Sequence, residues 1–265
     1  MTDRTPIGTG APPRPDMTTN CVLTDGGGRE RVLIPLPILE GQGVPGGLPE
    51  LLSTTDVILL GYHVVPEQTP PDMMRQQYEE QAQKSLSEVA ETFANAGGEA
   101  ETRLVFTHDR EQTVDRVLAE TGATAFLLPR PIASVDSVLV PLRGDVDAAR
   151  IARFVARLRG DRDIDVTLYA ATGEGEDAAA AAAAELVDLA AATLTDLGVP
   201  ADAITERAEV TDTPTRAIIR VAIAHDAVVM GKREPDWRSL IFGELHEQIA
   251  DESLGPVFVV GDVGE

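Results

Sequence analysis

Two glycines near the C-terminus have the spacing of a loop that can hold an anion. The apolar run "AVVMG" ends at Gly231, a polar loop follows, and Gly243 precedes a helical pattern over 244–253. Glycine lets a backbone approach a ligand closely, and a helix N-terminus attracts negative charge. The strand end and the helix start therefore form one side of a candidate binding crevice. Its residues on this side are Met230, Gly231, Lys232, Gly243, Glu244 and Leu245.

Acidic residues occupy the same loop and weaken the case for a phosphate. Glu234 and Asp236 lie inside it, and Glu244 stands at the start of the helix. A carboxylate there is favoured by the helix dipole, but it competes with a phosphate for the same positive end. The neighbouring basic residues either offset these acids or pair with them in a closed, ligand-free loop. Both alternatives fit the sequence.

The sequence shows no pattern of catalytic or metal-binding residues. Cys21 is the only cysteine, so it forms no internal disulfide, and a zinc site needs several ligands. The segment "HEQIA" has Ala250 where the second histidine of a zinc-protease helix would stand. Neither a GxSxG elbow nor a Walker loop is present. We therefore expect no catalytic residue and no metal site, and we interpret the chain as not being an enzyme.

The charge balance is strongly acidic. Acidic residues outnumber basic ones 44 to 22, the net charge is −22, and Lys84 and Lys232 are the only lysines. A folded protein of this composition indicates a halophilic surface, on which counterions screen the self-repulsion. The alternative is an ordinary acidic cytosolic protein. Nucleic acid is excluded as a partner in both cases, because binding it needs clustered positive charge.

The N-terminal segment has the composition of a flexible extension. Residues 1–30 are rich in glycine, proline and polar residues, and they lack the apolar core of a signal peptide. No apolar run approaches the length of a membrane span. These features predict a cytoplasmic protein without direct membrane insertion.

An internal repeat organises the rest of the chain. The run "RVLIPLP" at 31–37 matches "SVLVPLR" at 137–143, and both have the β-branched composition of buried parallel strands. Later in each half, a threonine-led helical pattern runs into another strand. The pattern predicts an α/β protein of two Rossmann-like domains, each a mostly parallel sheet flanked by helices. The expected boundaries are 31–135 for a truncated domain and 136–265 for a fuller one.

The two copies differ in completeness. In the second, a strand ends near Pro141, Asp145 is the expected cap of the following helix, and the next strand ends at Ala171. In the first, only a short link follows the fourth strand, so the loop, the fourth helix and the fifth strand are missing. The crevice is therefore expected in the second copy alone. Pro141, Arg143 and Ala171 form its other side, because ligands of such sheets lie outside the carboxyl ends of the strands.

The second copy resembles a universal stress protein domain, and the chain from about residue 31 resembles a tandem of two such domains. The matching segments are "VLVPL", "AVVMGKR", "SLIFGELHEQIADES" and "GPVFVV". In the family, nucleotide binding depends on a loop of glycine, two residues, glycine, nine residues, then glycine and serine or threonine. An aspartate after the proline of the first strand contacts the adenosine.

This sequence departs from that pattern at most of its positions. Gly231 and Gly243 match the first and last glycines, but Glu234 stands at the second glycine position and the following spacing is one residue short. Glu244 replaces the hydroxyl residue, and Arg143 replaces the aspartate. The resemblance therefore implies a degenerate adenine-nucleotide crevice that holds no cofactor, with weak binding of ATP or AMP in the second domain as the alternative.

Three classes of function follow from these observations. The leading one is a non-catalytic stress-response or regulatory protein that acts through protein contacts. The alternatives are a regulatory switch that binds ATP or AMP, and an ATP-using enzyme of a related α/β superfamily. The resemblance implies self-association through the strand at 256–260, which we expect at a sheet edge. It also implies association with a transporter, since similar domains occur attached to membrane transporters.

Overall fold

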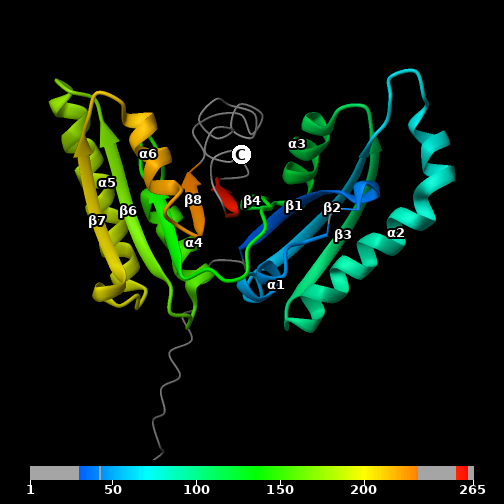
Figure 1. Ribbon diagram of the computed structural model, residues 1–265, viewed down its shortest axis with the longest axis horizontal. Coiled ribbons are helices and arrows are strands. Elements are labelled where there is room, and N and C mark those ends of the chain that lie inside the picture. The colour runs from blue at the N-terminus through cyan, green and yellow to red at the C-terminus, as the bar shows by residue number, and fades with distance from the viewer. Residues whose placement is uncertain (1–29, 42, 232–254, 262–265) are drawn as a thin grey trace, which may run out of the picture.

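One mostly parallel sheet forms the centre of the protein. The computed structural model describes residues 30–41, 43–231 and 255–261. Within these residues, nine strands lie in the order β3-β2-β1-β4-β9-β8-β5-β6-β7 (Figure 1). They are β1 (Arg31–Pro37), β2 (Asp56–Val64), β3 (Glu99–Thr107), β4 (Ala125–Leu128), β5 (Ser137–Pro141), β6 (Asp165–Thr172), β7 (Ile204–Val210), β8 (Ala227–Gly231) and β9 (Val257–Val260). The predicted α/β fold is confirmed.

Helices cover both faces of this sheet. One face carries α1 (Gly47–Leu51), α2 (Pro71–Asn95), α4 (Ala148–Arg159) and α5 (Asp177–Asp196). The other carries α3 (Arg110–Thr121) and α6 (Pro214–Ala222). Two short 3-10 helices, η1 (Ile38–Glu40) and η2 (Ala201–Ala203), lie in the connections. The inner strands are buried on both faces, which explains why they read as continuous apolar runs, whereas β3 and β7 are partly exposed.

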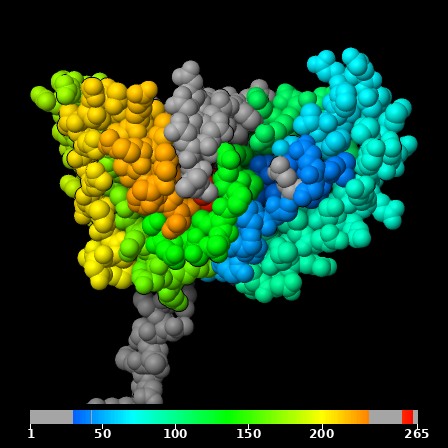
Figure 2. All heavy atoms as spheres, viewed as in Figure 1, coloured from blue at the N-terminus to red at the C-terminus, as the bar shows by residue number. Residues whose placement is uncertain are grey.

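The two halves of the sequence repeat the same strand order. The first half supplies β3-β2-β1-β4, and the second supplies β7-β6-β5-β8 from the opposite edge. Figure 2 shows the first half, blue to cyan, and the second half, yellow to orange, on opposite sides of the molecule. The hydrogen-bonded ladder continues between them through β9. The domain boundaries at 135 and 136 stay a prediction, and the extension at 1–30 lies almost entirely outside the described residues.

Strand β9 lies in the middle of the sheet, so the prediction that 256–260 forms an exposed edge was wrong. It runs parallel to β8 and antiparallel to β4, with Val257 paired to Leu128 and Val260 to Ala125. All four of its residues are buried, and Phe258 packs against Phe154 of α4 with ring centroids 5.7 Å apart. The first half has no fifth strand of its own, so β9 fills the position beside β4. Its backbone is therefore hydrogen-bonded on both sides.

The edges of the sheet are β3 and β7, and both carry charges. Glu101 and Arg103 are exposed on β3, and Glu206 and Arg207 are exposed on β7. Charged side chains on edge strands discourage pairing with another chain. The described edges are thus protected from pairing with a second chain, which the sequence analysis expected at the strand 256–260.

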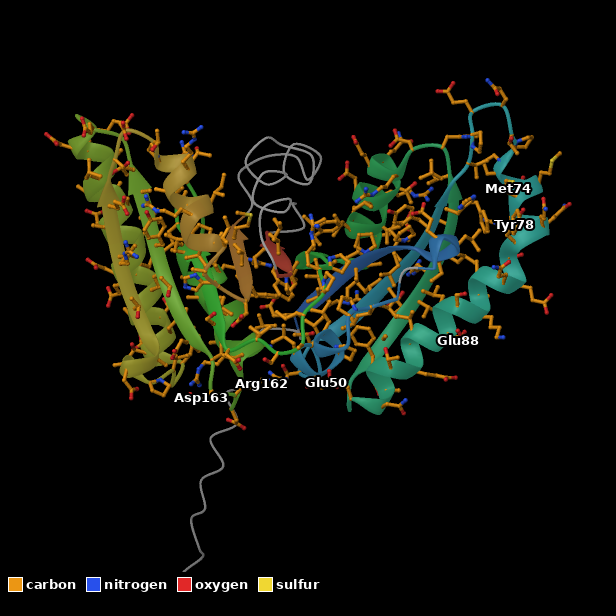
Figure 3. The ribbon with its side chains drawn as sticks, viewed as in Figure 1. Glu50, Met74, Tyr78, Glu88, Arg162 and Asp163 are labelled. Carbon is orange, nitrogen blue, oxygen red and sulfur yellow. The ribbon has the colours of Figure 1, made fainter. Side chains whose placement is uncertain are left out.

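Hydrogen bonds from α4 and the turn after it connect the two halves on one face. The Arg162 guanidinium donates to the main-chain oxygen of Glu50 and, at 3.0 Å, to the Ser53 hydroxyl. The Thr54 hydroxyl donates to the main-chain oxygen of Arg157 at 3.2 Å. Figure 3 shows Arg162 and Glu50 next to each other where the halves meet. These contacts hold the second half against α1 of the first.

Helix α5 is alanine-rich, and it has the length and apolar composition that would also fit a membrane span. It packs against α4, β6 and β7 as a helix covering the sheet. Val187, Ala190 and Leu194 form its buried face. The exposed fractions of Leu189 and Leu197 are 49% and 40%, so these two side chains point away from the sheet.

Candidate functional site

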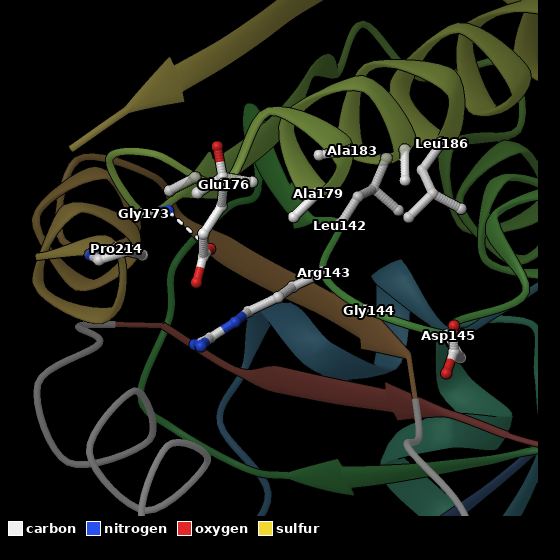
Figure 4. A pocket seen from close by; sticks show the side chains of 13 residues that line it. Leu142, Arg143, Gly144, Asp145, Gly173, Glu176, Ala179, Ala183, Leu186 and Pro214 are labelled. Carbon is white, nitrogen blue, oxygen red and sulfur yellow. Dashed lines mark hydrogen bonds between the residues drawn. The ribbon is translucent and has the colours of Figure 1, made fainter. Parts of the chain in front are cut away.

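A pocket of about 290 Å³ opens at the carboxyl ends of β5 and β6 (Figure 4). Leu142 and Arg143 follow β5, Ala171 and Gly173 lie at the end of β6, and Pro214 begins α6. One wall comes from α5 and consists of Ala179, Ala182, Ala183 and Leu186. The pocket lies where ligands of parallel α/β sheets bind.

The structure brings together some of the residues that the sequence singled out. Arg143 and Ala171 line the pocket, and Pro141 is the buried last residue of β5, directly before the lining residue Leu142. Met230 and Gly231 are buried at the end of β8 and do not line the pocket. The remaining predicted residues lie outside the described part of the chain: Lys232, Gly243, Glu244 and Leu245.

Gly231 has a packing role that requires no ligand. A Cβ atom at this position would lie 2.7 Å from Cδ1 of Ile151 and 3.0 Å from Cβ of Val146. Both neighbours are buried side chains that pack against the end of β8. Contacts this close would force the surrounding core to shift. Close packing near the start of α4 is therefore sufficient to explain this glycine.

The cap of α4 is Asp147, so the prediction of Asp145 was wrong. Asp147 Oδ1 accepts a hydrogen bond from the backbone N–H of Arg150 at 2.8 Å. Gly144, at a φ of 67°, turns the chain before the helix, and Val146 is buried against Gly231. Burial of Val146 delays the helix by two residues. Asp145 consequently remains exposed and lines the pocket.

The pocket contains one basic side chain and two acidic ones. Nη1 of Arg143 donates a hydrogen bond to the Thr215 hydroxyl at 3.2 Å, and in the described ranges the guanidinium forms no ion pair. The backbone N–H of Gly173 donates to Oε2 of Glu176 at 3.1 Å, which positions that carboxylate at the pocket. Asp145 is exposed nearby. The negative charge of both carboxylates opposes binding of a phosphate.

Sequence reasoning missed Glu176 and the wall from α5. The signal was present, because the acidic segment at 172–177 directly follows a strand whose carboxyl end borders the expected crevice. The sequence of this segment does not reveal the contact between Glu176 and Gly173. A Cβ at Gly173 would lie 3.0 Å from Oε2 of Glu176, so the glycine leaves room for this carboxylate.

The histidines within the described ranges have structural partners. The His63 ring packs edge-on against Phe106 with centroids 6.0 Å apart. Nδ1 of His108 is 3.0 Å from the Val65 carbonyl oxygen. His225 bridges the Val221 carbonyl oxygen at 2.8 Å and the hydroxyl of Thr167 at 2.9 Å. Thr167 lies near the start of β6, at the opposite end of the strand from the pocket. No group of three metal-binding side chains occurs within residues 30–41, 43–231 and 255–261.

A second charged cluster lies beside β6 and links Tyr169 to the edge strand. The Tyr169 hydroxyl donates to Oε2 of Glu209 at 2.8 Å, and Arg220 contacts Oε1 at 3.1 Å. The hydrogen bond from Tyr169 lowers the pKa of Glu209. Burial, with the bond to Glu209 next in importance, raises the pKa of Tyr169 above its ordinary value of 10.0. The cluster thus favours an ionised carboxylate and a protonated tyrosine.

Because of this cluster, we expect the unfolding free energies of the wild type and a variant without the Tyr169 hydroxyl to differ most near neutral pH. The Glu209 contribution is present above the ordinary carboxyl pKa and is lost as pH falls through the lowered value. The Tyr169 contribution is present below pH 10.0 and is lost as pH rises through the raised value. Replacing Tyr169→Phe should cost about 1 kcal/mol of unfolding free energy at neutral pH.

Urea unfolding of the wild type and the Tyr169→Phe variant across pH, at constant KCl, measures this difference. The two curves should converge as the pH falls through the Glu209 pKa. Tyr78→Phe is the matched control, because its hydroxyl accepts a hydrogen bond from the exposed Gln77 side chain on α2. A Tyr169→Phe effect that is the same at every pH would contradict the assigned linkage.

Comparisons with known proteins show which fold this is. No protein-family model matches the chain, and no curated protein matches its sequence. A universal stress protein from Archaeoglobus fulgidus DSM 4304 matches with a TM-score of 0.62 and 16% identity, over 88% of this chain and 96% of that one. The cytoplasmic domain of a prokaryotic cation chloride cotransporter matches with a TM-score of 0.51 and 12% identity, over 89% and 97%. The chain has the fold of universal stress proteins, as the sequence resemblance predicted.

Proposed function

We propose that this chain, on a universal stress protein fold, is a non-catalytic stress-response or regulatory protein that acts through protein contacts. The observation that carries the proposal is Arg143, whose side chain lines the pocket at the end of β5. The resemblance places an adenosine-binding aspartate at this position. Aspartate accepts hydrogen bonds, whereas a guanidinium only donates them. The crevice is thus a degenerate adenine-nucleotide site.

Two further features support a degenerate site. Packing against Ile151 and Val146 is sufficient to explain Gly231, without a phosphate beside it. Asp145 and Glu176 add negative charge to the lining of the pocket, which disfavours an anionic nucleotide. Like charges at short distance in a partly enclosed site oppose binding.

The setting we propose is the cytoplasm, with a protein partner or a second copy and with no nucleic acid. The likeness to a cytoplasmic domain of a cation chloride cotransporter supports association with a transporter as one form of that partnership. The acidic composition supports a halophilic protein. The histidine contacts of the described chain support the absence of catalysis, since each ring has a structural partner.

Purified wild-type protein is expected to retain no nucleotide in native mass spectrometry and to bind MgATP weakly or not at all in calorimetry. The combined change Arg143→Asp, Glu234→Gly and Glu244→Ser should increase MgATP affinity, because it restores the family's groups. Inserting one residue between Glu234 and Gly243 restores the loop length and belongs in the same series.

Arg153→Asp is the matched control for charge reversal, because Arg153 is exposed on α4 and does not line the pocket. It should leave MgATP binding unchanged. Tight MgATP binding by the wild type would reject the degenerate site and favour the ATP- or AMP-binding switch. Turnover of ATP above the background rate would favour the ATP-using enzyme.

A further inference from the structure

The pocket beside β5 and β6 is lined by a basic and an acidic side chain that form no ion pair with each other. Arg143 and Glu176 both line it, and Figure 4 shows the Arg143 side chain extending toward the Glu176 carboxylate. Within the described ranges these two groups form no ion pair: Arg143 contacts the Thr215 hydroxyl, and Glu176 contacts the backbone of Gly173.

One wall of the pocket is apolar and made of small side chains. Leu142, Ala171 and Ala183 are almost completely buried at its base, with exposed fractions of 0%, 2% and 7%. Ala179 and Leu186 continue this wall along α5. The alanines leave space that larger side chains would fill, and the cavity volume is about 290 Å³. A wall of this kind favours a short hydrocarbon group.

We propose that this pocket binds a small aliphatic zwitterion of the α-amino-acid class. The carboxylate contacts Arg143, the ammonium group contacts Glu176, and the hydrocarbon side chain lies against the alanine wall of α5. The proposal rests on the proposed function, because it requires that the crevice is not a nucleotide site.

The charges distinguish a zwitterion from the other ligand classes. A simple carboxylate would pair with Arg143 but would be repelled by Glu176 and Asp145. A simple amine would pair with Glu176 but would leave Arg143 without an anionic partner in the ligand. A zwitterion satisfies both groups at once, and hydrogen bonds between ionised partners are about twice as strong as neutral ones. The hydrogen bond from Gly173 holds Glu176 in place for this contact.

Three probes with the same branched hydrocarbon test the proposal on the full chain. They are L-leucine, 4-methylpentanoate, which lacks the ammonium group, and 3-methylbutylamine, which lacks the carboxylate. Calorimetry at one KCl concentration should give an L-leucine affinity at least about tenfold above that of either other probe. Equal affinity for the three probes, or no L-leucine binding up to about 10 mM, overturns the proposal.

Variants assign each charge to its partner. Arg143→Gln should lower L-leucine affinity about tenfold and leave 3-methylbutylamine binding no weaker than before. Glu176→Gln should lower L-leucine affinity about as much and leave 4-methylpentanoate binding no weaker. Arg153→Gln on α4 is the control and should change nothing. If neither pocket variant alters L-leucine binding, the assigned contacts are wrong.

Ala179→Trp tests the location through the hydrocarbon wall. Ala179 is exposed and lines the pocket, so a large ring there should block L-leucine while the melting temperature stays close to that of the wild type. L-leucine binding that persists in this variant places the ligand elsewhere and overturns the proposal. MgATP titrations of the same samples test the degenerate nucleotide site separately from the zwitterion pocket. A chain that binds neither ligand refutes the zwitterion alone, whereas tight MgATP binding refutes the degenerate site as well.

Discussion

The melting temperature of this protein should rise by more than about 10 °C between low salt and molar KCl, because salt shortens the range of charge repulsion. The chain has a net charge of −22, and many of its acidic side chains are exposed. The Debye length falls from about 30 Å at 0.01 M salt to about 3 Å at 1 M, so repulsion between carboxylates is largely removed. Thermal unfolding followed by circular dichroism measures the shift.

A charge-reduced variant separates screening from other effects of salt. Glu79, Glu80 and Glu91 are exposed on α2, and changing all three to glutamine removes repulsion without touching the core. This variant should melt above the wild type at low salt and close to it in molar KCl. Sucrose at matched osmolarity should not reproduce the KCl effect. A melting temperature that stays constant across the KCl range would remove the halophilic interpretation.

A glutamate at Val257 or Val259 should abolish the native fold. Both side chains have an exposed fraction of 0% in the central strand β9, between β4 and β8. An unpaired carboxylate buried in an apolar core costs several kcal/mol, which is comparable with the total stability of a typical domain. We expect the single variants to lose the cooperative thermal transition, and the double variant to be unfolded in molar KCl.

Val210→Glu is the matched control, because Val210 lies on the edge strand β7 with an exposed fraction of 58%. Its effect on the unfolding free energy should stay within about 0.5 kcal/mol. Light scattering should show no change of size for that variant. The prediction is contradicted if the Val257→Glu and Val259→Glu proteins melt like the wild type but dissociate into smaller particles. In that case β9 would lie at an exposed interface.

The sequence by itself determined the local elements. Apolar residues recur at helical spacing along α2, where Ala82, Leu86, Val89 and Phe93 are buried. Thr213 and Pro214 mark the start of α6, and the run "SVLVP" forms β5. These features depend on neighbours within a few turns or along one strand, so the residue pattern is sufficient to specify them. The α/β class of each half was also available, because the repeat of strands and helices resembled a known fold.

The tertiary structure alone decided which groups meet. β9 became central because the first half offers β4 without a fifth strand beside it, and strand pairing depends on every other strand present. Burial of Val146 moved the cap of α4 to Asp147, and the same packing accounts for Gly231. Arg143 and Glu176 lie far apart in the sequence and line one pocket because two parallel strands end at the same edge. Such contacts arise between distant segments, and a pattern read along the chain carries no information about the distance between them.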